Sequence, residues 1–524
     1  MAVEVMENAI LILDFGSQYT QLIARRIREL GFYAEIHPYF TPVGDIKQRI
    51  PGGIILSGSP ASVYDKDAPM PDSEIFKMGI PVMGICYGLC VLTHFYGGKV
   101  EASTHREYGK SSLTLKKSVG ILDSISNNSQ VWMSHGDKIT KLPSGFEAIG
   151  QTANSPFAVI YNKEKKFYGV QFHPEVGHSK YGKDILKNFS EKVCGLKKTW
   201  TMKNFAKKQI KDIRAIVGDQ KVILGLSGGV DSMVTARLIH DAIGDQLTCV
   251  YVDHGFMRLN ETEAVVKRFG EAFQIPLKVI KAENIFLNAL KGITDPEQKR
   301  KIIGRLFLEE FKKVALEKDK KGKTTHYEFL AQGTLYTDVI ESVSVKGPSQ
   351  TIKSHHNRVQ EIMDMIQAGR IIEPLKELFK DEVRKLGLAL KMPRDLLFRH
   401  PFPGPGLAIR ILTDVTKSRL DLLRKADSIL LEELKSQKLY SKVWQAFAVF
   451  LPVQSVGVMG DKRTYENVIA LRMVESQDGM TADFARVPHD FLGFVSNRII
   501  NEVAGINRVV YDISTKPPAT IEWE

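Results

Sequence analysis

Cys86 lies in a sequence pattern that can present a nucleophile, Gly84-Ile-Cys86-Tyr-Gly88. Glycines two residues before and after a nucleophile permit a sharp turn from a strand into a helix, with the nucleophile exposed at the turn. A helix N-terminus also favours the thiolate, the form of cysteine that attacks a carbonyl carbon. We expect the backbone N–H of Tyr87 to stabilise the resulting oxyanion, with the loop at Gly58 supplying a second donor.

A base for this cysteine follows in the stretch Val170-Gln-Phe-His173-Pro-Glu175, directly after another predicted strand. The proline restricts His173 to extended backbone, which places the side chains of His173 and Glu175 on the same side of the chain. A histidine can take the thiol proton while a carboxylate holds the imidazole in orientation. The three residues therefore predict a Cys-His-Glu catalytic triad.

The same cysteine also permits a metal-binding interpretation. Cys86, Cys90 and His94 are spaced by four residues, so a helix would bring them to one face. Such a set offers three ligands at most, one fewer than a structural zinc site, and it leaves the two glycines unexplained. We therefore prefer the triad.

A second candidate site begins at Val222 and reads Val-Ile-Leu-Gly-Leu-Ser-Gly-Gly-Val-Asp-Ser. The apolar run predicts a buried strand, Ser227 to Gly229 a tight turn, and Asp231 onward the first turn of a helix. Adjacent glycines let backbone N–H groups converge on an anion, and the helix N-terminus adds its positive end. The lysine of the common G-x-x-x-x-G-K-[ST] loop is missing, so the stretch predicts a different phosphate-binding loop. A glycine-rich turn without a ligand is the simpler alternative.

The stretch Ser227 to Met233, here called the phosphate loop, resembles the pyrophosphate loop of the N-type ATP pyrophosphatases, which split ATP into AMP and pyrophosphate. The resemblance implies that ATP is a substrate and that Mg²⁺ accompanies it, with Asp231 as a metal ligand. No prosthetic group is expected. The residues implied to bind ATP are Ser227, Gly228, Gly229, Val230, Asp231, Ser232 and Met233.

Residues 9 to 199 resemble the class I glutamine amidotransferases. Besides the triad motifs, the resemblance rests on Ser57-Gly58, Arg106-Glu-Tyr-Gly109 and Ser134-His-Gly-Asp137. It implies that Cys86 attacks the side-chain amide of glutamine, that His173 moves protons and that Glu175 holds His173, so that glutamate and ammonia are formed. Cys90 and Ser59 depart from the family pattern, which usually has Gln and Gly at these positions.

The whole chain resembles the glutamine-hydrolysing GMP synthases. Five further stretches carry this resemblance: Val252–Arg258, Lys299–Gly304, Gln332–Tyr336, Asp338–Ser342 and Ile352–Asn357. It implies that ATP adenylates XMP and that ammonia from the thiol site then displaces AMP to give GMP. The segment 358–370 and a Lys-rich stretch near residue 318 depart from many bacterial members.

The GMP synthase resemblance also assigns a role to the C-terminal tail, Lys516 to Glu524. By its composition alone, this polar, proline-containing end would be a frayed terminus. The resemblance instead implies that the tail folds into the XMP site and that the C-terminal domain forms a homodimer. The implied XMP contacts are Arg300, Gln454, Lys516 and Glu522.

Several domains must position these residues, because 524 residues exceed the usual size of one domain. Short apolar runs alternate with helical patterns around both candidate sites, which predicts parallel sheets. We therefore predict an α/β protein with three domains. They are a class I amidotransferase domain at 1–199, an adenine-nucleotide α-hydrolase-like ATP pyrophosphatase domain at 200–399, and a small α+β dimerisation and XMP-binding domain at 400–524.

The boundary between the second and third domains falls at the turn-rich linker His400-Pro-Phe-Pro-Gly-Pro-Gly406. Before it, Glu373 to Leu390 has the pattern of an amphipathic helix. After it, we expect a strand at Leu407 to Leu412 and a long helix from Thr416.

Composition narrows the class of protein. With 43% hydrophobic and 25% charged residues the chain is an ordinary globular protein, and its net charge of +12 suits anionic nucleotides. The Lys-rich stretches lack the interleaved aromatics of a single-strand binder, so we predict no nucleic-acid partner. Four cysteines make no disulfide framework, and no apolar run is long enough to span a membrane, so we expect a cytoplasmic protein without a membrane partner. The alternatives are another ATP-pyrophosphatase amidotransferase, a tRNA-modifying adenylating enzyme and a non-catalytic nucleic-acid-binding protein.

Overall fold

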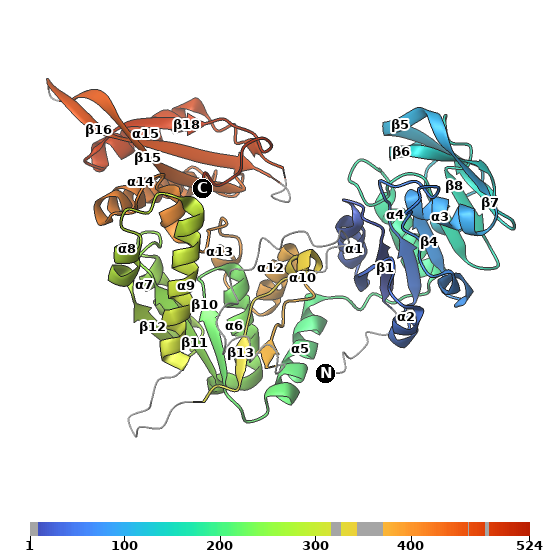
Figure 1. Ribbon diagram of the computed structural model, residues 1–524, viewed down its shortest axis with the longest axis horizontal. Coiled ribbons are helices and arrows are strands. Elements are labelled where there is room, and N and C mark those ends of the chain that lie inside the picture. Colours follow the sequence, from blue (N-terminus) through green and yellow to red (C-terminus); the bar gives the residue numbers. More distant parts are fainter. Residues whose placement is uncertain (1–8, 316–325, 343–369, 460, 477–480) are drawn as a thin grey trace. The chain divides into compact units, whose positions relative to one another are not determined.

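The computed structural model describes residues 9–315, 326–342, 370–459, 461–476 and 481–524 (Figure 1). They belong to two compact units. The first comprises Met1–Phe205 with Val339–Gln350, and the second comprises Ala206–Asp338 with Thr351–Glu524. The motif Ile352–Asn357, nearly all of the segment 358–370 and the Lys-rich stretch near 318 lie outside the described residues. Within the described ranges, no helix is both long and apolar enough to cross a membrane.

The first unit is built on a nine-stranded sheet with the order β2-β1-β3-β4-β9-β8-β7-β5-β6. The five strands from β2 to β9 pair in parallel and the remaining pairs are antiparallel. The strands are β1 (Ile10–Asp14), β2 (Ala34–Pro38), β3 (Gly53–Leu56), β4 (Val82–Ile85), β5 (Lys99–Leu115), β6 (Ser129–Lys141), β7 (Glu147–Gln151), β8 (Val159–Asn162) and β9 (Phe167–Val170). The apolar strands β1, β3 and β4 are buried and pair in parallel, which confirms the parallel sheet predicted from the short apolar runs of the sequence.

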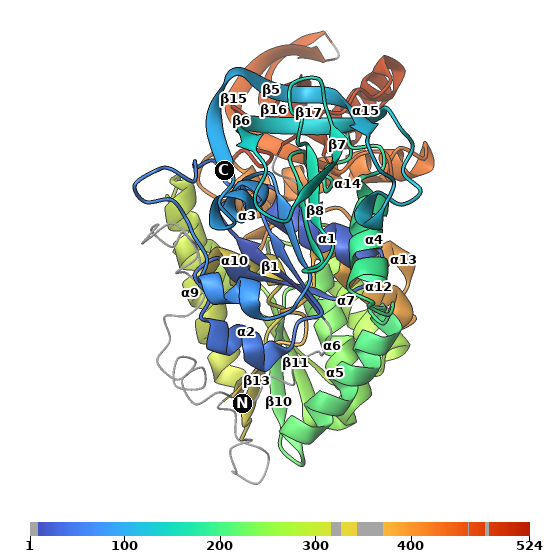
Figure 2. The ribbon, with the colours of Figure 1, turned by 90° about the vertical axis from the view of Figure 1, so that its right-hand side faces the viewer.

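Helices cover this sheet, with α1 packed beside α4 and α3 against β4 (Figure 2). The helices are α1 (Thr20–Glu29), α2 (Val43–Arg49), α3 (Tyr87–Phe95) and α4 (Gly182–Asn188), with short 3₁₀ or π turns at Ser73–Lys77, Gly120–Leu122 and Phe189–Val193. The chain then enters α5 (Met202–Val217), in which the first unit ends.

The second unit begins with a five-stranded parallel sheet of order β12-β11-β10-β13-β14. Its strands are β10 (Val222–Leu226), β11 (Leu247–Asp253), β12 (Leu277–Lys281), β13 (Phe329–Ala331) and β14 (Ile371–Ile372). The α-helices that accompany it are α6 (Val230–Ile243), α7 (Glu261–Lys267), α8 (Glu283–Ala289), α9 (Pro296–Ala315), α12 (Lys380–Ala389) and α13 (Arg394–Leu397). Helix α10 (Tyr336–Ser342) begins in the second unit, and its residues from Val339 on are grouped with the first. The α/β fold class predicted from the sequence is thus confirmed.

A mainly antiparallel sheet, flanked by two helices, forms the C-terminal part of the second unit. Its elements are α14 (Lys417–Ser436), β15 (Gln445–Met459), β16 (Lys462–Glu475), β17 (Asp483–Phe484), α15 (His489–Glu502) and β18 (Ile506–Asp512). One hydrophobic core joins this part to the parallel sheet, since Ile223 and Val250 belong to the same cluster as Leu420 and Phe450. The long helix expected from Thr416 is present, and the Thr416 hydroxyl caps it by accepting from the Arg419 N–H.

Two local predictions were wrong. Residues 407–412 form no strand: Gly406–Arg410 is a 3₁₀ turn, and only Ile411 makes a single β-bridge, to Phe450. A short apolar run does not distinguish strand from buried turn, and here Gly406 adopts a φ of +64° while the Leu407 N–H bonds to the Phe256 carbonyl.

The helix predicted from Glu373 begins only at Lys380. Pro374 has no backbone N–H and disfavours a helix that would run through this position. The Glu373 carboxylate accepts a hydrogen bond from the Thr334 hydroxyl at 2.6 Å. The error arose because charged and apolar residues in this stretch imitate the period of a helix.

Candidate active sites

The nucleophile pattern around Cys86 folds into the predicted turn between β4 and α3. Cys86 has φ +53° and ψ −104°, a strained conformation for a residue with a side chain, and its N–H bonds to the Val170 carbonyl at 2.8 Å. A Cβ on Gly84 would lie 2.4 Å from the Gly88 carbonyl, and one on Gly88 would lie 2.4 Å from the Leu56 carbonyl. Both glycines are therefore required by close backbone packing around the thiol.

His173 and Glu175 form a buried pair behind this thiol. The imidazole Nδ1 lies 2.6 Å from the Glu175 Oε1, and the two side chains are 4% and 1% exposed. Burial alone would lower the pKa of His173, but the Glu175 carboxylate and the neighbouring Cys86 sulfur outweigh it and hold the pKa well above its usual value. With Nδ1 engaged by the carboxylate, Nε2 is the ring nitrogen left to exchange a proton with the sulfur.

The predicted oxyanion donors lie at the same turn. Tyr87 is the first residue of α3, so its N–H has no partner within the helix. Gly58 follows β3, and a Cβ added to it would approach the His173 ring to 3.3 Å, so this loop borders the triad. The Gly88 N–H, which bonds to the Ser57 carbonyl at 3.1 Å, ties the two segments together.

A cavity of about 710 Å³ opens onto the thiol, within the size range of small-molecule sites. Its lining includes Cys86 and His173, Tyr19, Ser59, Cys90 and the stretch Ser134–Asp137 of β6. Burial raises the pKa of Cys90 well above its usual value, with a smaller contribution from Cys86, so this second thiol stays protonated. Within the described ranges, no cluster of three or more His, Cys, Asp or Glu side chains could hold a metal, which disfavours the metal interpretation of Cys86, Cys90 and His94.

The phosphate loop lies at the carboxyl end of β10. Gly228 has φ +74°, and the Ser227 hydroxyl oxygen accepts from the Gly229 N–H at 3.2 Å. The Ser232 hydroxyl, one turn into α6, donates back to the Gly229 carbonyl at 3.0 Å. Strand order reverses between β10 and β13, and the crevice at such a switch point is where open α/β sheets bind ligands.

Two basic residues that the sequence did not single out contact this loop. Lys380 Nζ lies 2.6 and 2.5 Å from the two carboxylate oxygens of Asp231, and Arg399 Nη1 donates to the Gly228 carbonyl at 3.1 Å. They are separated from their partners by 149 and 171 residues. No local motif marks either residue, because a lysine opening a charged helix and an arginine before a linker both look like solvated surface.

The C-terminal tail is ordered by three basic side chains with no exposed surface. Arg410 makes a bidentate ion pair with Glu522, from Nε to Oε2 at 3.0 Å and from Nη2 to Oε1 at 2.8 Å. Lys299 Nζ lies 2.6 Å from a Glu524 carboxylate oxygen. Arg472 donates to the carbonyls of Ser514, Thr520 and Ile521. The tail is therefore part of the folded protein, not a frayed end.

The four residues predicted to contact XMP lie in different parts of the second unit. Arg300 lies on α9 next to Lys299, and its charge acts on Glu524, so α9 and the tail meet. Lys516 pairs with Ala482 in an antiparallel bridge. Gln454 is exposed on β15 opposite Asn467, and among the described residues no hydrogen bond or ion pair joins it to Glu522. Arg300 thus lies near the end of the tail that also carries Glu522, whereas Gln454 lies on an exposed part of β15.

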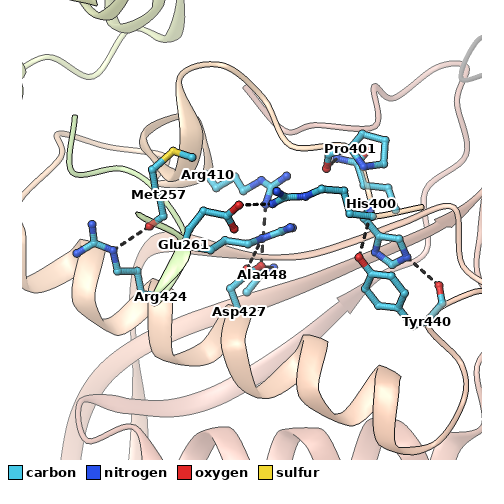
Figure 3. A network of polar contacts seen from close by, with 12 residues as sticks. Met257, Glu261, His400, Pro401, Arg410, Arg424, Asp427, Tyr440 and Ala448 are labelled. Carbon is cyan, nitrogen blue, oxygen red and sulfur yellow. Dashed lines mark hydrogen bonds and ion pairs between the residues drawn. The ribbon is translucent and has the colours of Figure 1, made fainter. Parts of the chain in front are cut away.

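A polar network connects the loop after β11, helix α14 and the linker near His400 (Figure 3). Arg258 Nε donates to Asp427 at 3.0 Å, and the other oxygen of Asp427 accepts from the Ala448 N–H. Arg424 Nε donates to the Met257 carbonyl. The sequence motif ending at Arg258 therefore has a structural role that its composition did not reveal.

Comparisons with known proteins cover most of the chain. Three family models match: glutamine amidotransferase class-I at residues 11–193, the PP-loop domain at 201–300 and the GMP synthase C terminal domain at 432–523. A GMP synthase (glutamine-hydrolyzing) of Nitratiruptor sp. is 59% identical over 99% of this chain and 100% of its own. Those of Aquifex aeolicus and Wolinella succinogenes are each 57% identical over 98% of this chain, and over 99% and 98% of their own.

Proposed function

This chain belongs to the family of glutamine-hydrolysing GMP synthases, and we propose which of its residues carry each step of that reaction. The protein is a ligase that joins glutamine hydrolysis to the ATP-dependent amination of XMP. Glutamine, XMP and ATP are its substrates, and GMP, AMP, pyrophosphate and glutamate are its products.

Cys86 is the nucleophile of the glutamine half. Its thiolate attacks the side-chain amide carbon of glutamine, and the N–H groups of Tyr87 and Gly58 stabilise the oxyanion. Protonated His173 gives its proton to the departing ammonia, leaving a glutamyl thioester on the sulfur. Water then attacks the thioester while His173 takes its proton, and glutamate leaves. The 2.6 Å contact between His173 and Glu175, beside the thiol, is the observation that carries this assignment.

The phosphate loop binds ATP in the synthetase half. Residues Ser227 to Met233 hold the pyrophosphate portion, through the backbone N–H groups that are not bonded within the loop, while an oxygen of the XMP base attacks the α-phosphorus and pyrophosphate leaves. Mg²⁺ is commonly held by one or two carboxylates together with substrate phosphates, so the carboxylate of Asp231 suits this metal at the loop. Bound Mg²⁺ would neutralise charge on the leaving pyrophosphate. Ammonia then displaces AMP from the adenylated base.

We assign XMP binding to Arg300, Gln454, Lys516 and Glu522, with the tail as the supporting element. The contacts of Arg410 and Gln445 with Glu522 support this assignment, because they hold the carboxylate in one orientation. The Glu522 carboxylate is therefore already oriented to accept a hydrogen bond from a ligand.

The division into domains at 1–199, 200–399 and 400–524 is retained as a proposal, supported by the three stretches that the family models match. We also propose a homodimer formed through the C-terminal domain. Exposed apolar side chains on β15 and β16 support it: Val453, Val456, Val458 and Tyr465 are 47% to 75% exposed. Such a group of apolar residues on a surface marks a site of association.

One assay tests the separation of the two halves. The protein is incubated with ATP, Mg²⁺, XMP and either glutamine or ammonium, and loss of XMP is followed. Cys86→Ala should abolish the reaction with glutamine and leave the reaction with ammonium intact. Cys249→Ala, which removes a buried thiol from β11, is the matched control and should leave both reactions active. Loss of both reactions in a folded Cys86→Ala protein would overturn the two-site assignment.

A further inference from the structure

Arg399 contacts the glycine turn of the phosphate loop from a distant part of the chain. It lies two residues after α13 and directly before the linker that opens with His400. Its Nη1 donates to the Gly228 carbonyl at 3.1 Å, and its Nη2 lies 2.6 Å from Glu261 Oε1. The side chains of Arg399 and Glu261 are only 14% and 9% exposed, so this ion pair is largely shielded from water.

The contact restricts a single peptide unit. The Gly228 carbonyl and the Gly229 N–H belong to the same planar peptide and point in opposite directions. A donor that holds the carbonyl therefore also sets the direction of the N–H. Gly228 has φ +74°, a conformation that glycine adopts freely and can leave freely. Within the loop the Gly229 N–H donates to the Ser227 hydroxyl oxygen at 3.2 Å, and Arg399 adds a restraint from outside the loop.

Arg399 is itself held on a fixed support. The His400 N–H donates to the Tyr440 hydroxyl at 2.9 Å, and its ring stacks on Tyr440 with centroids 3.8 Å apart (Figure 3). His400 Nε2 lies 2.8 Å from the Tyr440 carbonyl oxygen, and burial lowers the pKa of His400 to about 4, so the ring is neutral and Nε2–H donates. Two consecutive residues thus bind the phosphate loop on one side and, on the other, Tyr440 in the segment that follows α14.

We propose that Arg399 is a positioning residue for ATP: by holding the Gly228–Gly229 peptide in one orientation, it fixes the turn from which the other N–H groups of the phosphate loop reach the pyrophosphate. The inference rests on the proposed role of this loop in binding ATP. Glu261 balances the charge of Arg399, so the effect is on orientation more than on long-range attraction. If Arg399 served only to hold the parallel sheet against the C-terminal part of the second unit, its loss would weaken the binding of ATP and XMP to the same extent.

The ammonium-dependent reaction of the full chain tests this proposal. Arg399→Gln should raise both the KM for ATP and the inhibition constant of Mg²⁺-pyrophosphate by about tenfold, the value of one charge-assisted hydrogen bond. The KM for XMP and the glutaminase activity should stay unchanged. Arg399→Lys, which keeps the charge and one donor, should give intermediate values.

Arg214→Gln is the matched control. Arg214 donates to the Ala242 carbonyl at 2.6 Å, at the opposite end of the helix that the phosphate loop opens, so its loss should leave the ATP and pyrophosphate constants unchanged. Should Arg399→Gln fail to fold, Glu261→Gln, which releases one side of the guanidinium, should raise the same two constants to a smaller extent.

Two results would overturn the inference. One is an Arg399→Gln protein with the ATP and pyrophosphate constants of the wild type. The other is a parallel rise in the constants for ATP and XMP together with a lower melting temperature, which would indicate a general brace. Failure of the proposed function itself is distinguishable, because the unmodified protein would then consume no ATP in the presence of XMP and ammonium.

Discussion

Lys380 Nζ lies 2.6 and 2.5 Å from the two carboxylate oxygens of Asp231, joining the start of α12 to the phosphate loop. Asp231 is thereby held at the position where the loop becomes a helix. The lysine also brings a positive charge next to the proposed pyrophosphate site, at a loop whose sequence lacks the lysine of the commoner phosphate loops.

Lys380→Gln should weaken ATP binding. Without the ammonium group, the Asp231 carboxylate loses its ion-pair partner and the phosphates of ATP lose a nearby positive charge. The KM for ATP in the ammonium reaction should therefore rise by about tenfold. Lys385→Gln is the control, because Lys385 lies on the same helix in an exposed pair with Asp381. An unchanged KM for ATP in Lys380→Gln would show that the lysine serves only the fold.

Glu175→Gln should move the pH profile of the glutaminase reaction. In the wild type the carboxylate helps hold the pKa of His173 well above its usual value, so the protonated ring persists as the pH rises. Without the carboxylate, the Cys86 sulfur alone of these two groups opposes the effect of burial, so the pKa of His173 falls and the ring should lose its proton at a lower pH. The alkaline limb of kcat/KM for glutamine should therefore shift to lower pH, and the rate should fall.

The ammonium-dependent reaction is the internal control for this variant, since it needs no triad. It should keep its rate and its pH profile in Glu175→Gln. An alkaline limb that stays in place would show that Glu175 does not set the protonation of His173.

Gly88→Ala should damage both stability and glutamine hydrolysis. The added Cβ would lie 2.4 Å from the Leu56 carbonyl, so β3 and α3 must move apart at the thiol. We expect a loss of about 1–3 kcal/mol in the free energy of unfolding, as for other overpacked sites, measured by thermal or denaturant unfolding. Gly44→Ala in α2, where a Cβ meets nothing within 4 Å, should be neutral or stabilising. Equal stabilities of the two variants would contradict this account of the glycine pattern.

Arg410→Gln should lower the stability of the protein and weaken the binding of XMP. Arg410 has no exposed surface and pairs with Glu522 through two nitrogens, so its loss leaves a carboxylate without its cation. Breaking such a pair costs about 3–5 kcal/mol when both groups are buried, and less here because Glu522 is 21% exposed. The melting temperature should fall, and the KM for XMP should rise while glutaminase activity remains.

Adding Glu522→Gln to Arg410→Gln separates stability from binding. The double variant should recover much of the melting temperature, because no unpaired charge is left, but it should not recover the KM for XMP. Recovery of both would show that Glu522 contributes to folding and not to the nucleotide site.

The sequence by itself determined the features that depend on a few adjacent residues. The glycines around Cys86 and Ser227 are demanded by local backbone geometry, and Pro174 sets the direction of the chain between His173 and Glu175. Alternating apolar runs likewise predict parallel strands, because the pattern reflects burial of each strand. These signals lie within single turns of the chain, where spacing alone decides which groups can meet.

The tertiary structure decided everything that depends on distant partners. Lys380, Arg399 and Arg410 look like ordinary surface charges in the sequence, yet each holds a group more than a hundred residues away. The run Leu407–Leu412 likewise became mostly a turn, since the Leu407 N–H bonds to the Phe256 carbonyl and the run meets strand β15 only at its end, through Ile411 and Leu412. The physical reason is the same in each case. A charged side chain or an apolar run interacts with whichever group the folded chain brings near it, and the spacing of residues in the sequence does not indicate which group that is.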